Sequence, residues 1–292
     1  MKKTMLVIAT LAFGVTGAFA QDLTSKKGET FLPESGDWSI GVDATPILTY
    51  VGGFFSNAGA TAPTWNFLNG NQTIVGKMYT SETTAYRGIL RIGMNSSHAV
   101  NNVVQDGATA PTFPTAPAIV QDEAKSSSHF IGLGAGMEMR RGKTRLQGFY
   151  GADAMFWMSG SKSTYTYGNA FSATNVAPTS TNWGTNINPT YATWGGRETE
   201  NKSGSTIGFG VRAFIGAEYF ILPKISIGAE FGWGLGIAMT GEGSGTCESI
   251  TAPGTGQSTT YVTSGKSGGL MLDTDRNAFG TGNGSLRLNL HF

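Results

Sequence analysis

The sequence predicts an all-β protein: an eight-stranded antiparallel transmembrane β-barrel of meander topology, with long extracellular loops and short periplasmic turns. Two observations predict this fold class. Beyond residue 20, large apolar residues alternate with small or polar ones almost everywhere, which indicates strands, and helical periodicity is almost absent. The connections also alternate in length between tight turns and long polar stretches, as in barrels that cross a membrane.

The composition excludes several classes of protein. Charged residues make up 13% of the 292 residues, against about 25% in an ordinary globular domain, and 43 residues are glycine. The formal net charge is +1, so we expect no nucleic acid as a partner. With 39% hydrophobic residues the chain is also unlike a disordered, solvating polypeptide.

The first twenty residues differ in kind from the rest. Lys2 and Lys3 precede an apolar run, and Ala18-Phe19-Ala20 places small residues where a signal peptidase cleaves. We therefore predict a signal peptide over residues 1–20 and a barrel domain over residues 21–292. The alternative is an N-terminal membrane anchor, which the short apolar run and the cleavage pattern disfavour.

Eight segments show the alternation of a strand: residues 37–48, 72–80, 85–96, 128–140, 144–158, 204–220, 224–239 and 283–292. Strands in soluble sheets are usually about 5–6 residues long, whereas a tilted strand that crosses a bilayer needs about 9–11. The first strand begins an apolar face with Trp38, Ile40 and Val42, and the facing of the second is ambiguous. The apolar faces of the next five begin, in chain order, with Tyr86, Ile131, Leu146, Ile207 and Ile225.

The connections between these strands follow one rule. Tight turns are expected at residues 81–84, 140–143 and 222–224, and long loops at 49–71, 97–127, 159–203 and 240–282. If the first strand runs outward, every tight turn falls on the periplasmic side, and the chain ends there only with an even number of strands. "SGGLMLD", within residues 262–282, either extends the eighth strand or belongs to the last loop.

The two faces of the strands have different expected surroundings. A charge facing lipid at the membrane midplane costs about 2–4 kcal/mol, so the apolar face should meet lipid and the charged face the lumen. The lumen charges are then Asp43, Arg87, Arg91, Glu138, Arg145, Asp153, Arg212, Glu218, Glu230 and Arg287. Five are cations and five are anions.

Eight strands enclose a space that side chains can fill, whereas open sieves have about 16–18 strands. Because an unpaired buried ion is costly, we expect these charges to pair across a filled polar lumen. The alternative is a charged pore or proton path.

The end of the chain, "GSLRLNLHF", alternates Leu286, Leu288 and Leu290 and closes on Phe292. It is similar to the C-terminal assembly signal of outer-membrane barrels. Together with "TAYRGILRIG", "RRGKTRLQGFYGADA" and "PKISIGAEFGWG", the layout resembles small barrels of the OmpA/porin-like β-barrel superfamily. The resemblance implies a bacterial outer-membrane location, lipid surroundings and the barrel assembly machinery as a partner. No peptidoglycan-binding domain follows the eighth strand, so the anchor role of two-domain members is not implied.

Few residues suggest chemistry. Of three histidines, His98 and His129 fall near the expected outer rim, and His129 follows Ser126, Ser127 and Ser128. With Asp122 or Glu123 as the acid, a nucleophilic site for an outer-leaflet lipid hydrolase is one alternative. No metal spacing or nucleotide motif is present, so no catalytic residue, cofactor or metal is expected. Cys247, the single cysteine, receives no role.

These observations favour a protein that is not an enzyme. It would serve envelope structure, or bind an extracellular ligand through loops 49–71, 97–127, 159–203 and 240–282. A narrow porin-like channel for small solutes is the first alternative, and the rim hydrolase is the second.

Overall fold

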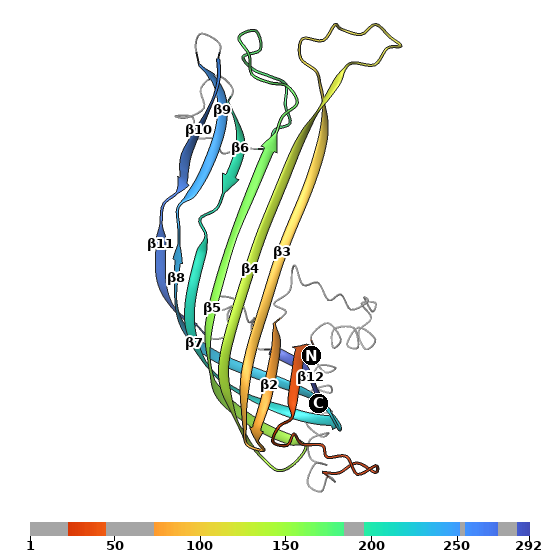
Figure 1. Cartoon of the computed structure of the whole chain (residues 1–292), viewed down its shortest axis with the longest axis vertical. Helices are drawn as coiled ribbons and strands as arrows, with labels where there is room; N and C mark the ends of the chain where they lie inside the picture. The colour runs from red at the N-terminus through yellow and green to blue at the C-terminus, as the bar shows by residue number, and fades with distance from the viewer. Residues whose placement is uncertain (1–22, 45–72, 184–195, 252–254, 274–284) are drawn as a thin grey trace, which may run out of the picture.

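The computed structural model describes residues 23–44, 73–183, 196–251, 255–273 and 285–292. The predicted signal peptide and the expected loop 49–71 lie outside these residues. In this part of the chain no helix has the length and hydropathy to cross a membrane. The all-β prediction is confirmed: the described residues form one antiparallel sheet of twelve strands (Figure 1). The strands are β1 (Trp38–Asp43), β2 (Ile74–Ser81), β3 (Thr84–Val104), β4 (Ile119–Arg141), β5 (Leu146–Thr166), β6 (Arg197–Lys202), β7 (Thr206–Leu222), β8 (Ile225–Thr240), β9 (Gly243–Thr251), β10 (Thr255–Ser264), β11 (Ser267–Asp273) and β12 (Ser285–His291).

Eight of these strands close into a ring in the order β1, β2, β3, β4, β5, β7, β8, β12 and back to β1. They correspond to the eight strands expected from the sequence. The last strand closes the ring through pairs that run from Ser39↔His291 to Asp43↔Arg287. Beyond β12, the backbones of Trp38 and Phe292 exchange two hydrogen bonds of 3.1 and 2.8 Å.

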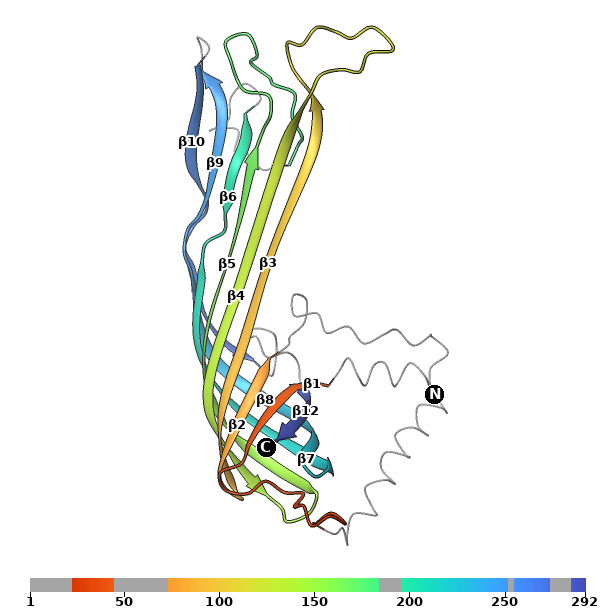
Figure 2. The same ribbon diagram turned by 45° about the vertical axis from the view of Figure 1, so that its right-hand side comes forward.

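The expected loops 97–127, 159–203 and 240–282 are wrong in part, because they contain strands. β3 and β4 stay paired as far as Val104↔Ile119, and β6, β9 and β10 continue the sheet beside the end of β5. Figures 1 and 2 show these parts rising well above the short strands β1, β2 and β12. Ser, Asn and Thr lie on both faces there, so apolar alternation does not reveal the strands. We call β6, β9, β10 and the parts of β3–β5 beyond Met94, Phe130 and Met158 the upper sheet.

The segment "SGGLMLD" forms β11, which continues the line of the last expected strand, now β12, as one of the two alternatives proposed. β11 pairs with the upper part of β8 from Ser267↔Thr240 to Asp273↔Gly234. β12 pairs with the lower part of the same strand from Ser285↔Glu230 onward. Both strands therefore lie along one edge of β8.

The side chains inside the ring differ from those outside it, because successive residues of a strand point to opposite faces of the sheet. Outward positions carry exposed apolar side chains, for example Leu90 on β3, Val211 on β7 and Leu235 on β8. Inward positions are buried and mostly polar, but they also hold the aromatic residues Tyr79, Phe149, Trp157, Phe214 and Phe220.

Glycines on neighbouring strands make room for the large inward rings. A Cβ atom added to Gly208 would collide with the Trp157 indole, and one added to Gly216 would collide with the Phe149 ring. The many glycines of the alternating strands therefore allow the narrow ring to hold both charges and large aromatic groups.

Candidate functional site

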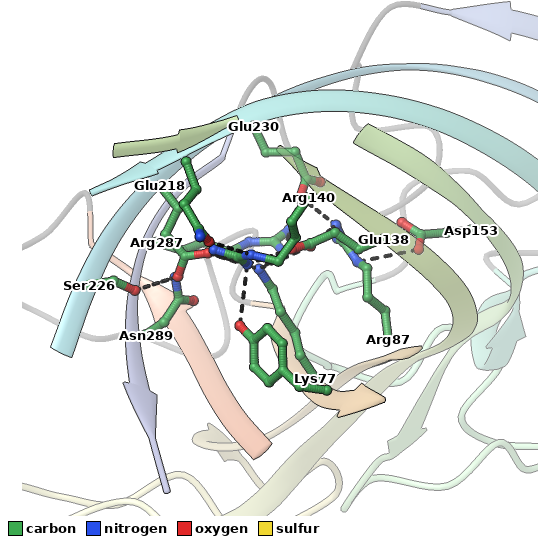
Figure 3. Close-up of polar contacts among 12 residues, drawn as sticks. Lys77, Arg87, Glu138, Arg140, Asp153, Glu218, Ser226, Glu230, Arg287 and Asn289 are labelled. Atoms are coloured by element: carbon green, nitrogen blue, oxygen red, sulfur yellow. Dashed lines mark hydrogen bonds and ion pairs between the residues drawn. The ribbon is translucent and has the colours of Figure 1, made fainter. Parts of the chain in front are cut away.

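The candidate site is the charged interior of the ring (Figure 3). Seven of the ten expected lumen charges are buried there: Arg87, Glu138, Asp153, Arg212, Glu218, Glu230 and Arg287. They come from β3, β4, β5, β7, β8 and β12, so their ion pairs join strands on different sides of the ring. We call these residues, with Lys77 and Arg140, the interior network.

Glu230 on β8 is the centre of one half of the network. Its carboxylate lies 2.8 Å from Arg87 Nη1, 2.6 Å from Arg212 Nη1 and 3.7 Å from Arg287 Nη1. Asp153 lies beside two of the same cations, 3.4 Å from Arg87 Nε and 3.7 Å from Arg212 Nη1. Three arginines thus share two carboxylates in a region closed to solvent.

Glu138 and Glu218 form the other half. Arg140 Nη1 donates hydrogen bonds to Glu138 at 2.8 Å and to Glu218 at 2.7 Å. Lys77 Nζ bridges the same two carboxylates at 3.0 and 3.4 Å. Because Arg87 also reaches Glu138 at 3.2 Å, the two halves form one continuous network.

Two members of the network were missed in the sequence. The facing of Lys77 was ambiguous, although Val75, Lys77 and Tyr79 are all inward positions of β2. Arg140 lies where the expected strand 128–140 meets the expected turn 140–143, but β4 continues to Arg141 and places Arg140 beside Glu138 on the inward face. The alternation already present within the expected strands 72–80 and 128–140 places both residues on the inward face.

The remaining three expected lumen charges have other surroundings. Asp43 is half-buried at the end of β1, where its backbone pairs with that of Arg287. The Arg91 guanidinium lies over the Phe130 ring at 4.6 Å, above the network. The Arg145 guanidinium lies at 3.5 Å over Phe31 of the segment before β1. The expected balance of five cations and five anions in one cluster is therefore not observed.

Uncharged groups complete the interior. The Arg87 guanidinium stacks on Phe214 at 3.9 Å, and Lys77 lies 4.8 Å from the centre of the Phe149 ring. Asn289 Nδ2 donates to Glu218 at 2.6 Å, and Ser226 also bonds to this carboxylate. Polar and aromatic contacts together connect the ring across its width.

A second cluster of polar contacts lies at the far end of the upper sheet, and we call it the outer clamp. Asp122 is fully buried on β4 and accepts hydrogen bonds from the backbone of Gly168 at 2.8 Å and of Thr181 at 2.6 Å. Asn169 donates to the carbonyls of Val104 and Thr179 at 2.8 and 2.9 Å. These contacts fasten residues 167–183 to the ends of β3 and β4.

Arg197 extends the clamp to β6 and β9. Its Nε donates to Glu248 at 2.6 Å, and its Nη2 donates to the carbonyl of Asn169 at 2.5 Å. The guanidinium also lies over the Tyr167 ring at 4.1 Å. The stretch that was expected to be a plain loop is thus tied to strands on two sides.

The clamp should depend on acidity through Asp106. Hydrogen bonds from Thr179 and Asn175 hold the pKa of this carboxyl below its ordinary value of 3.8. A depressed pKa stabilises the folded loop above that ordinary value, and the stabilisation is lost as the pH falls through the folded-state pKa. We expect the Thr179 amide resonance to titrate below pH 3.8 and the Asp106→Asn variant to lose this titration. A Thr179 amide that is insensitive to acid in the wild type would contradict the prediction.

The residues considered for a rim hydrolase are not brought together. The Ser126 hydroxyl bonds to Ser163 at 2.8 Å, and Ser126 and His129 occupy opposite faces of β4. Asp122 is engaged in the clamp, and Glu123 pairs with His98 at 3.3 Å and with Lys125 at 3.0 Å. None of these acids orients His129 toward a serine. Among the residues that the structure describes, no group of His, Cys, Asp and Glu is arranged to hold a metal ion.

Comparison with known proteins found no matching family model and no matching curated protein.

Proposed function

We propose that this protein is a bacterial outer-membrane β-barrel, related to the OmpA/porin-like superfamily, with a lumen filled by charged side chains. Its role is to present the upper sheet and its loops for interaction at the cell surface, and it catalyses no reaction. The observation that carries the proposal is the inverted distribution of side chains. Charges are buried inside the ring, while large apolar side chains are exposed outside it.

The apolar exterior supports a membrane location. Ile92 and Met94 on β3, Trp233 on β8 and Ile215 on β7 are each about half exposed, with 50, 63, 48 and 55% of their surface accessible. Soluble monomers rarely expose a continuous apolar surface of this kind. Antiparallel pairing around the whole ring also satisfies the backbone groups internally, as lipid requires.

The height of the apolar surface fits a bilayer. On β3 this apolar surface spans nine residues, from Tyr86 to Met94. The next residues of β3 that face away from the ring interior are the polar Ser96 and His98. A membrane-crossing strand needs about 9–11 residues. The upper sheet therefore begins where the lipid would end, and it stands outside the membrane.

The interior network supports a filled lumen over a channel. An eight-stranded barrel is about wide enough for side chains to fill. Here arginine, lysine and carboxylate groups contact one another from several sides of the ring at 2.6–3.7 Å. An ion would have to break several buried pairs to pass, and each lost pair is costly.

The closing strand suggests how the barrel is assembled. Leu290 on β12 and Phe292, the residue that follows this strand, are exposed, and the Phe292 ring stacks on Trp38 at 4.5 Å between ring centres. We infer that this strand, with Leu286 and Leu288, is read by the barrel assembly machinery before it pairs with β1.

Single-channel recording tests the filled lumen. Purified protein, shown to be folded by heat-modifiable gel mobility, is inserted into planar bilayers and recorded in potassium chloride. We expect no steady conductance above that of protein-free bilayers, because the network closes the ring. A large, steady conductance would favour the narrow channel and would refute a filled lumen. A change of lipid A in cells that overproduce the protein, lost on His129→Ala substitution, would instead favour the hydrolase.

A further inference from the structure

The upper sheet has two faces of different chemistry. At the levels just above the apolar surface, the outward face carries His98, Lys125, Lys162 and Glu200, which are charged or titratable. The inward face of the same strands exposes none, because its two carboxylates, Asp122 on β4 and Glu198 on β6, are buried and hydrogen-bonded. Its side chains, from Gly93 to Asn101 on β3, Ala124 to Phe130 on β4 and Ser159 to Tyr165 on β5, are small, polar and uncharged, or aromatic.

These inward side chains remain accessible. Asn95, Ser97, Ser128 and Ser161 are exposed, and Ser163 is half-buried. Surfaces designed for solubility carry about 25–35% charged residues. A surface of this extent without an exposed charge is therefore unusual, and its hydroxyl and amide groups offer both donors and acceptors.

Aromatic rings border this surface at its outer end. Trp183, in the segment held by the outer clamp, stacks on Tyr165 of β5 with 6.1 Å between ring centres and 21° between planes. It also lies 6.3 Å from the Tyr167 ring. Asp122 accepts a hydrogen bond from the backbone of Thr181, and the Trp183 amide donates to the Thr181 carbonyl at 3.1 Å, so the backbone that carries the ring is held in place without a ligand. Preorganisation of this kind lowers the entropic cost of binding.

We propose that the inward face of the upper sheet binds a neutral oligosaccharide. Sugar hydroxyls both donate and accept hydrogen bonds, as the serine and asparagine side chains of this face do. The apolar faces of sugar rings pack on amphipathic aromatic rings such as Trp183 and Tyr165. Anionic glycans and acidic or basic peptides are disfavoured, because the face exposes no cation and its carboxylates, Asp122 and Glu198, are buried. The inference rests on the proposed surface role, since it names the class of partner that the upper sheet takes.

Adjacent serines on β4 supply a matched pair of variants. Ser128 lies on the inward face and Ser127 on the outward face, and both are exposed. Ser128→Asp places a carboxylate on the proposed site, whereas Ser127→Asp places the same charge on the opposite side of the same strand. Trp183→Ala removes the aromatic border.

Binding is measured by calorimetry with hexasaccharides of glucose, mannose, galactose and N-acetylglucosamine. The protein is kept in a detergent without a sugar headgroup and is first shown to be folded by heat-modifiable mobility. We expect the wild type to bind at least one of the four. Ser128→Asp and Trp183→Ala should weaken that binding about tenfold or more, equal to about 1.4 kcal/mol, and Ser127→Asp should leave it within about twofold.

Three outcomes would overturn the inference. They are no binding of any neutral hexasaccharide by folded wild-type protein, equal weakening by both aspartate variants, and displacement of the sugar by uncharged hexapeptides of similar affinity. None of these outcomes bears on the proposal of a membrane barrel, because that proposal is tested separately by insertion and conductance.

Discussion

Replacing Glu230 by Gln is expected to destabilise the folded protein by about 3–5 kcal/mol, the usual cost of removing one partner of a buried ion pair. Glu230 lies within 3.7 Å of Arg87, Arg212 and Arg287, and its side chain is 3% exposed. The substitution keeps the shape of the side chain but removes the negative charge that three buried guanidinium groups share, and only Arg87 and Arg212 also contact Asp153. The free energy of unfolding, from urea titration of the protein in lipid vesicles, measures the effect.

The matched control is Glu242→Gln. Glu242 is 52% exposed and lies 3.8 Å from Lys266, so its replacement should cost less than about 1 kcal/mol. A second variant, Glu230→Gln combined with Arg212→Gln, removes a cation together with the anion and should recover part of the lost stability. If Glu230→Gln and Glu242→Gln have equal effects, the interior network does not stabilise the ring.

Replacing Val211 by Arg should cost about 2–4 kcal/mol in vesicles, which is the cost of an arginine near the bilayer midplane. Val211 faces outward on β7 with 57% of its surface exposed, between Phe209 and Ile215, which are also exposed. In a protein surrounded by water, the same change at an exposed site would shift the stability by no more than about 0.5 kcal/mol. The size of the effect therefore distinguishes lipid from water on this face.

Ser127→Arg provides the comparison for this experiment. Ser127 is exposed on the outward face of β4 but lies above the apolar surface, at the level of Lys162. The two variants carry the same new charge on the same side of the sheet at different heights. We expect only Val211→Arg to destabilise the protein, and a small effect at Val211 would count against membrane insertion.

The ring strands were predictable because one of their faces is apolar. Tyr86, Leu90 and Ile92 on β3 alternate with Arg87 and Arg91, and this alternation indicated both the strand and its two faces. The upper sheet was not predictable in this way. Ser96, Ser97 and His98 have no apolar partner positions, so residues that pair in the structure resemble a loop in the sequence.

The contacts inside the ring depend on closure. Alternation indicates that Glu230 and Arg87 point inward, but they lie 143 positions apart in the chain. Glu230 and Arg87 meet because ring closure and the registers between neighbouring strands place β3 and β8 across the interior from each other. Arg140 shows the same limit, because its partner Glu218 belongs to β7 and only the closed sheet brings the two together.

The sequence by itself determined the all-β class, the eight ring strands, and the separation of an apolar face from a charged one, because an alternation of period two encodes all three locally. Only the tertiary structure decided which charges pair, that Lys77 and Arg140 join them, and that polar strands rise above the ring. These features depend on register and closure between distant strands, and no local pattern carries that information.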